Sequence, residues 1–144
     1  MTDSDTISTD SAPQPVGPYP HARRVGDLLF LSGIGPRPAG GGPVPGVTLD
    51  EHGEVSSWDI ELQCHAVFAN VKAVLDSAGS SWDDLVDITV FLTDIRRDFD
   101  VFNRVYSEYF SGDGPCRTTV EVNRLPTPIA IELKCIARAR PDRA

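Results

Sequence analysis

The chain contains hydrophobic patterns of two periods, one near 3.6 residues and one of two residues. Residues 58–79 and 98–110 carry apolar side chains at helical spacing, whereas residues 85–93 and 129–139 carry them at alternate positions. Apolar residues three and four apart line one face of a helix, and alternate residues line one face of a strand. The pattern therefore predicts two amphipathic helices and two half-buried strands.

The ends of the predicted helices carry residues that favour helix starts and stops. Asp59 suits the positive N-terminal end of the first helix, and Gly79 suits its C-terminal stop. Asp98 is the expected cap of the second helix. These residues place the two helices within residues 58–79 and 98–110.

Two further strands are predicted, over residues 28–32 and 117–122, each following a turn rich in glycine. The apolar face of the strand over residues 85–93 is predicted to consist of Val86, Ile88, Val90 and Leu92. The last strand is predicted to place Ile131, Leu133, Cys135 and Ala137 on one face. The resulting order of strands and helices indicates an α+β fold of two layers, with both helices on one face of the sheet.

The uncovered face of that sheet is mixed in character. In the last strand it carries the charged residues Glu132 and Lys134 together with the apolar Ile136. Such a face is neither fully polar nor fully apolar, and packing against copies of the same chain would cover it. The pattern is a weak indication of an oligomer.

Two segments lack periodicity. Residues 1–16 are polar and acidic, which predicts a disordered tail ahead of a single domain over residues 17–140. Residues 34–47 are dense in glycine and proline and predict a long loop. A loop of this length is either functional or a surface excursion, and the sequence leaves both alternatives open.

The composition narrows the classes of partner. The 144 residues have 13 basic and 21 acidic side chains, so the net charge is −8. This charge argues against nucleic acid or an anionic membrane as the main partner, although a local arginine can still bind a small anion. The chain also has no apolar run of the length that a membrane span needs.

The sequence predicts neither a metal site nor a cofactor. Its three histidines and three cysteines are scattered, without metal-ligand spacing, and glycine-rich phosphate-binding motifs are missing. The odd number of cysteines and the lack of a signal peptide at the N-terminus favour a reduced, cytoplasmic protein.

Arg117 and Glu132 are the strongest candidates for chemistry. Glu132 stands in an otherwise apolar strand, where a carboxylate is costly unless it is paired or hydrogen-bonded. The two residues come from successive predicted strands, so we expect that they can lie close together. They form either an ion pair without chemistry or a clamp for an anionic ligand next to a base.

Four stretches, in this order, resemble the RidA family, also called YjgF/YER057c: "GPYPHARRVGDLLFLSG", "FNRVYSEYF", "GPCRTTVEVNRLP" and "IAIELKCIA". The resemblance spans residues 17–138 and is closest to 2-aminomuconate deaminases, through "YPH", the longer loop and "GPxRTTV". It implies a chorismate-mutase-like fold with a mixed sheet. It also implies a homotrimer with a central barrel and sites at the subunit interfaces.

The resemblance also implies roles for individual residues. Arg117 matches the arginine that binds a substrate carboxylate, and Glu132 matches the glutamate that handles the attacking water. The positions that match substrate-binding residues are Tyr19, Ser32, Asn103 and Thr119, the last of which is a cysteine in RidA proper. We hypothesise that Arg37 holds a second carboxylate; the alternative is a solvated surface arginine. The other candidates for this role are His21, Arg23 and Arg124.

The resemblance implies a deaminase without metal or cofactor, which hydrolyses an enamine or imine carboxylate to a keto acid and ammonia. 2-Aminomuconate is the first candidate substrate. The alternatives are a general 2-imino acid deaminase and a trimeric small-molecule binding protein without turnover. A nuclease is disfavoured by the net charge of −8, because phosphate contacts dominate nucleic-acid affinity.

Overall fold

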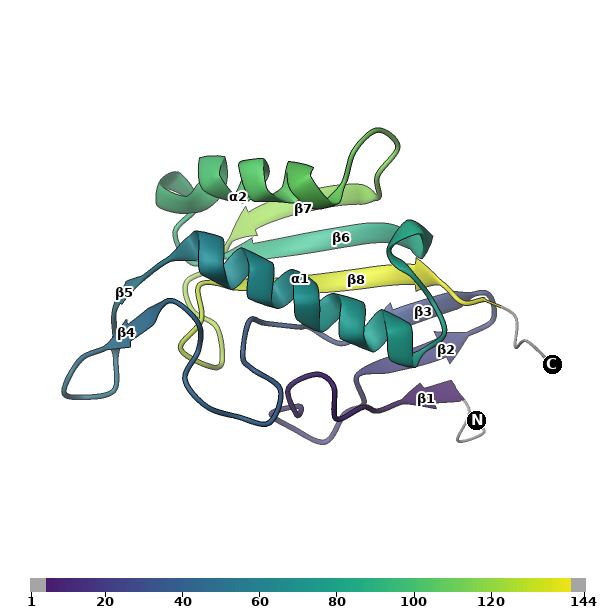
Figure 1. Cartoon of the computed structure of the whole chain (residues 1–144), viewed down its shortest axis with the longest axis horizontal. Coiled ribbons are helices and arrows are strands. Elements are labelled where there is room, and N and C mark those ends of the chain that lie inside the picture. The colour runs from purple at the N-terminus through teal and green to yellow at the C-terminus, as the bar shows by residue number, and fades with distance from the viewer. Residues whose placement is uncertain (1–4, 141–144) are drawn as a thin grey trace.

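The computed structural model describes residues 5–140 as two layers, a sheet and two helices (Figure 1). The main sheet contains β1 (Thr6–Ile7), β2 (Ala22–Val25), β3 (Leu28–Leu31), β6 (Leu85–Leu92), β7 (Cys116–Glu121) and β8 (Ile131–Arg138). A separate hairpin is formed by β4 (Val47–Leu49) and β5 (Val55–Trp58). The helices are α1 (Ile60–Ser77), α2 (Ile95–Tyr109) and the short 3₁₀ helix η2 (Trp82–Asp84).

The sheet has the strand order β1-β2-β3-β8-β6-β7. All neighbouring strands are antiparallel except β6 and β7, which are parallel. A parallel pair needs a crossover connection, and α2 lies between β6 and β7 in the chain. Figure 1 shows α1 and α2 on the same face of the sheet. The predicted α+β fold with two helices on one face of a mixed sheet is therefore confirmed.

The N-terminal ends of both long helices are capped by aspartates. Asp59 lies at the start of α1, as predicted, and accepts a hydrogen bond from the amide of Leu62. The cap of α2, however, is Asp94, which accepts from the amide of Arg97. Asp98 is only 1% exposed and accepts a hydrogen bond from the indole of Trp58 at 2.8 Å. The prediction of Asp98 as a cap was wrong because the helix begins one turn earlier.

The alternation of β8 is confirmed, because Ile131, Leu133, Cys135 and Ala137 are buried beneath the helices. In β6, Ile88, Val90 and Leu92 also face the core. Val86 does not, since it is 41% exposed. The pairing of β6 with β8 shifts register between Leu85 and Asp87, so Leu85 takes the inward position instead.

The segment from residue 5 to residue 16 is packed on the sheet, which contradicts the predicted disorder there. Its strand β1 pairs with β2, and Ala12 is buried in the core. His21 holds the segment from both ring nitrogens: Nδ1 accepts from the amide of Thr9, and Nε2 donates to the carbonyl of Pro13. Residues 1–4 of the predicted tail lie outside the described residues.

The loop after β3 is irregular, as predicted, but its first part is anchored. The side-chain amide of Asn70, a buried residue of α1, donates to the backbone carbonyls of Gly35 and Arg37 at 2.8 and 2.7 Å. These bonds hold the backbone of Arg37 against α1. The hairpin β4–β5 that follows was not predicted.

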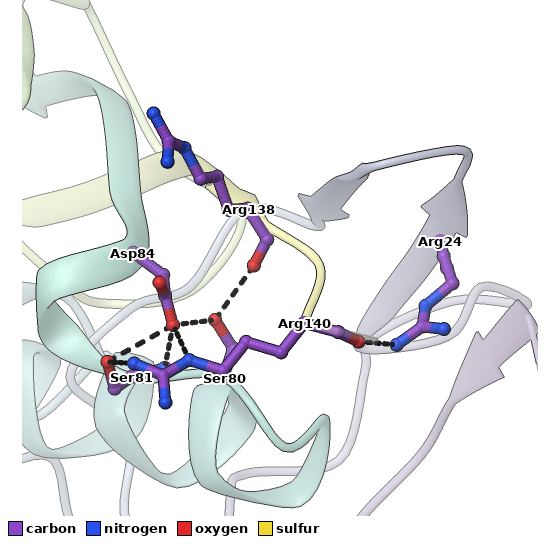
Figure 2. Close-up of polar contacts among 6 residues, drawn as sticks. All are labelled: Arg24, Ser80, Ser81, Asp84, Arg138 and Arg140. Carbon is purple, nitrogen blue, oxygen red and sulfur yellow. Dashed lines mark hydrogen bonds and ion pairs between the residues drawn. The ribbon is translucent and has the colours of Figure 1, made fainter. Parts of the chain in front are cut away.

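The end of β8 is tied to the α1–β6 connection and to β2 (Figure 2). The guanidinium of Arg140 donates to Asp84 at 2.5 Å and to the hydroxyl of Ser81 at 3.0 Å. Arg24 donates to the backbone carbonyl of Arg140 at 2.7 Å. Although burial alone would raise it, the pKa of Asp84 is held below its usual value by the hydrogen bonds from Arg140 and Ser81.

No helix within residues 5–140 is long and apolar enough to cross a membrane.

Candidate active site

Arg117 stands on β7 and faces the helix layer. Its Cα is paired with that of Ile88, a core residue of β6. The guanidinium carbon lies 4.7 Å from the ring centroid of Tyr106 and 5.1 Å from that of Phe102. One guanidinium nitrogen donates to the amide oxygen of Asn103 on α2 at 2.8 Å. The guanidinium of Arg117 is thus packed against aromatic rings and oriented by its hydrogen bond to Asn103.

Thr119 lies two residues along β7 from Arg117 and therefore on the same face of the sheet. Its hydroxyl oxygen is buried and has no hydrogen-bond partner within residues 5–140. An arginine with unused donors, an oriented amide and an unpartnered hydroxyl can together bind an oxyanion. We call Arg117, Asn103 and Thr119 the arginine cluster.

Glu132 stands on β8 between the buried residues Ile131 and Leu133, so its side chain points to the face away from the helices. A Cβ added to Gly33 would lie only 3.0 Å from a carboxylate oxygen of Glu132. The carboxylate therefore occupies space that only a glycine leaves open. Partial burial raises the pKa of Glu132, and the positive charge of Arg37 opposes that rise.

Tyr19, Ser32 and Arg37 lie around a small cavity that Gly33 also lines. The hydroxyl of Ser32 donates to the carbonyl of Pro20 at 2.7 Å, and the phenol of Tyr19 accepts from the amide of Val16 at 3.3 Å. Arg37 donates to the carbonyl of Gln14 at 2.8 Å. We call Glu132 together with these three residues the glutamate cluster.

The structure does not bring Arg117 and Glu132 together within one chain. Strand β6 lies between β7 and β8 in the sheet. On β6, Ile88 is the partner of Arg117 and Phe91 is the partner of Glu132. These partners are an odd number of positions apart, so they point to opposite faces of the sheet. The prediction that successive strands place them close together was wrong, because chain order is not spatial order in this sheet. Arg117 and Glu132 lie on opposite faces of the sheet.

Gly33 is a feature of the glutamate cluster that sequence analysis did not single out. Gly33 follows Ser32, and this "SG" pair is the sequence feature from which its role could have been predicted. The absence of a side chain at this position allows the Glu132 carboxylate to lie against the backbone.

Several side chains of metal-binding types are buried or hydrogen-bonded within the fold. In the described part of the chain, no group of three His, Cys, Asp or Glu side chains could hold a metal ion. Burial raises the pKa values of the Cys64 and Cys135 thiols to about 12. Nδ1 of His65 is hydrogen-bonded to the phenol of Tyr109 at 2.7 Å.

Comparison with known proteins identifies the family. Residues 9–139 match the family model described as Endoribonuclease L-PSP. The chain belongs to this family, which includes RidA and YjgF. A RutC family protein of Pyrococcus abyssi is 41% identical over 92% of this chain and 95% of its own length.

Two further relatives support the assignment. Reactive Intermediate Deaminase A, chloroplastic, of Arabidopsis thaliana is 34% identical over 92% of this chain and 65% of its own length. The crystal structure of the YjgF gene product from E. coli has a TM-score of 0.79 and 34% identity, and covers 94% of this chain and 98% of the other. The RidA-like fold therefore extends over nearly the whole chain.

Proposed function

We propose that this protein is a cofactor-independent deaminase that hydrolyses imines or enamines of small carboxylic acids to keto acids and ammonia. Two observations support the proposal beyond family membership. A carboxylate with a raised pKa, Glu132, stands over a glycine, and an oriented arginine, Arg117, has free donors. These are the base and the carboxylate clamp that such a reaction needs.

The single observation that carries the mechanism is that Arg117 and Glu132 lie on opposite faces of the sheet. Within one chain, the proposed base and the proposed clamp for the carboxylate next to the C=N carbon cannot act on the same substrate. We propose that the site forms where the arginine cluster of one chain meets the glutamate cluster of a neighbouring chain. A homotrimer whose sheets surround a central barrel, as the family resemblance implies, is the proposed assembly.

The uncovered sheet face supports an assembly of this kind. It exposes apolar side chains from three strands, of which Val25 is 58% exposed. The other exposed apolar residues on this face are Leu28, Phe30 and Val120. Exposed apolar side chains are costly in water, and burial against other copies of the chain removes that cost.

In the proposed reaction, Arg117 grips the substrate carboxylate with two parallel hydrogen bonds, while Asn103 fixes the guanidinium plane. The free hydroxyl of Thr119 adds a donor on the same side. This grip places the adjacent C=N carbon at a fixed position and makes attack on it effectively intramolecular. The clamp acts by positioning alone.

Glu132 then acts on water. Its carboxylate takes a proton from the water as the oxygen bonds to the protonated C=N carbon, which gives a carbinolamine. Proton transfer to nitrogen and collapse of the carbinolamine release ammonia and leave the C=O bond of the keto acid. An iminium is already a good electrophile, so no metal or organic cofactor takes part.

We propose 2-imino acids with one carboxylate, such as 2-iminopropanoate, as the general substrate class. 2-Aminomuconate, which has two carboxylates, is the specific candidate that Arg37 would favour. The guanidinium of Arg37 is close enough to Glu132 to lower the pKa of that carboxyl group. Arg37 could therefore hold the distal carboxylate of the substrate near Glu132. The proposal predicts faster ammonia release from one or both substrates.

The test is ammonia release from 2-iminopropanoate, generated in situ from alanine by an amino-acid oxidase, with and without the protein. Acceleration that is lost in Arg117→Ala supports the deaminase. Binding of carboxylates without acceleration would favour the non-catalytic binding protein instead. Cleavage of single-stranded RNA without ammonia release would favour the activity named in the family's description.

A further inference from the structure

A second cavity of the molecule is separate from both clusters. It has a volume of about 360 Å³ and lies between the β4–β5 hairpin and the loop over residues 123–130. The α1 residue Gln63 lines it from the helix side of the sheet, whereas the Glu132 side chain points to the opposite face. The volume is sufficient for a small organic molecule.

Gln63, one of the residues that line this cavity, has an unused side-chain donor. The residue is 0% exposed, and its amide oxygen accepts a hydrogen bond from the backbone amide of Ala130 at 2.8 Å. That bond fixes which end of the amide is nitrogen. The nitrogen, Nε2, has no hydrogen-bond partner within residues 5–140. A buried amide donor without a partner is costly, so a ligand that supplies an acceptor would be favoured.

Two further groups on the same cavity can also donate. The hydroxyl oxygen of Thr127 is buried and has no partner in the described part of the chain. Arg124 lines the cavity with an exposed guanidinium. Glu54 is the acidic residue among the lining residues, and it is exposed, so water weakens but does not remove its repulsion of an anion. An amide, a hydroxyl and a guanidinium together match a ligand that only accepts hydrogen bonds.

We propose that this cavity binds a small monocarboxylate. One carboxylate oxygen accepts from Nε2 of Gln63 and from the hydroxyl of Thr127, and the other accepts from Arg124. An ionised carboxylate only accepts hydrogen bonds, so it can satisfy all three donors and brings no donor of its own. Glu54 disfavours a second negative charge in the ligand. The proposal does not depend on the deaminase activity.

The experiment is a titration of the full chain with propanoate, followed by nuclear magnetic resonance of the side-chain NH₂ of Gln63. It is done in the Arg117→Ala variant, which removes the other proposed carboxylate site. We expect saturable shifts of the Gln63 NH₂ and of the Ala130 amide. Absence of saturable shifts up to about 100 mM propanoate, well above millimolar dissociation constants, would overturn the proposal.

Three controls test the chemistry. Adding Arg124→Ala or Thr127→Val should weaken propanoate binding by about tenfold, as expected for a lost hydrogen bond to a charged group. Adding Arg96→Ala, which removes the same charge from an exposed site that does not line the cavity, should leave binding unchanged. Propanamide should bind about tenfold more weakly than propanoate. Equal binding of the two ligands would exclude a carboxylate site.

Discussion

Arg117 and Glu132 lie on opposite faces of one sheet, with strand β6 between their strands. Arg117 faces the aromatic rings of α2, and Glu132 faces away from the helices beside Gly33. A mechanism that uses both residues on one substrate therefore requires two chains.

Substitution of Arg117 should weaken substrate binding. We expect Arg117→Ala to lower kcat/KM for 2-iminopropanoate by about 10- to 100-fold, because a charge-assisted hydrogen-bonded pair contributes about 1.5–3 kcal/mol. Arg117→Lys keeps the charge but loses the fork, and should recover only part of the activity. Steady-state kinetics test this, with circular dichroism to confirm folding. Equal activity of the Lys and wild-type proteins would contradict a bidentate clamp.

Substitution of Glu132 should separate activity from stability. We expect Glu132→Gln to lower kcat by about 10²- to 10⁴-fold, the usual contribution of a general base. Because the pKa of Glu132 is raised in the folded state, its ionisation opposes folding. This destabilisation is absent at pH values below the pKa of Glu132 in the unfolded chain. It grows as the pH rises towards and through the pKa of Glu132 in the folded protein.

The same substitution should therefore raise the melting temperature relative to wild type at neutral pH, and the gain should vanish in acid. Thermal denaturation at a series of pH values measures it. A gain that is larger in acid than at neutral pH would show that the sign of the pKa shift is wrong.

Substitution of Arg37 should change the pH dependence of catalysis. Its positive charge lowers the pKa of Glu132, so in Arg37→Ala the acid limb of the kcat/KM profile should move to higher pH. Arg37→Lys keeps the charge and serves as the matched control. If Arg37 also holds a distal carboxylate, KM should rise more for 2-aminomuconate than for 2-iminopropanoate. An equal rise in KM for both substrates would remove Arg37 from the substrate site.

Substitution of Gly33 should displace the proposed base. A Cβ at this position would lie 3.0 Å from the Glu132 carboxylate, too close without movement of that side chain. We expect Gly33→Ala to lower kcat by at least about tenfold, since a displaced base loses its alignment with water. The melting temperature and kcat are measured together. Gly114→Ala serves as the glycine control, because its Cβ would lie 3.5 Å from the Cβ of Phe110, an ordinary van der Waals contact.

The elements with strong periodicity could be predicted from the sequence. The stripe of α1 and the alternation of β8 each reflect burial on one face, and both were confirmed. The position of Val86 could not be predicted, because a register shift in β6 interrupts an alternating pattern that looks regular. The hairpin β4–β5 was missed because its strands are short and mostly exposed. Residues 5–16 were missed because hydrogen bonds to His21 and the burial of Ala12 hold them, rather than any periodic pattern.

The sequence pointed to candidate site residues but not to their arrangement. The sequence singled out Arg117 and Glu132, and their local surroundings fit a clamp and a base. Their separation follows from the insertion of β6 between β7 and β8, which no local pattern encodes. Long-range strand order depends on which faces can be buried together, so it emerges only in three dimensions.

The most direct test of the account mixes two inactive variants. Arg117→Ala and Glu132→Gln chains are unfolded together, refolded together and assayed for ammonia release from 2-iminopropanoate. If each site takes Arg117 from one chain and Glu132 from its neighbour, random assembly of an equal mixture leaves about one site in four intact. Each of the two positions has a chance of about one half of holding the chain with the residue that the site needs there. The account predicts recovery of about a quarter of wild-type activity. Activity that stays at the level of the separate variants would contradict a site shared between chains.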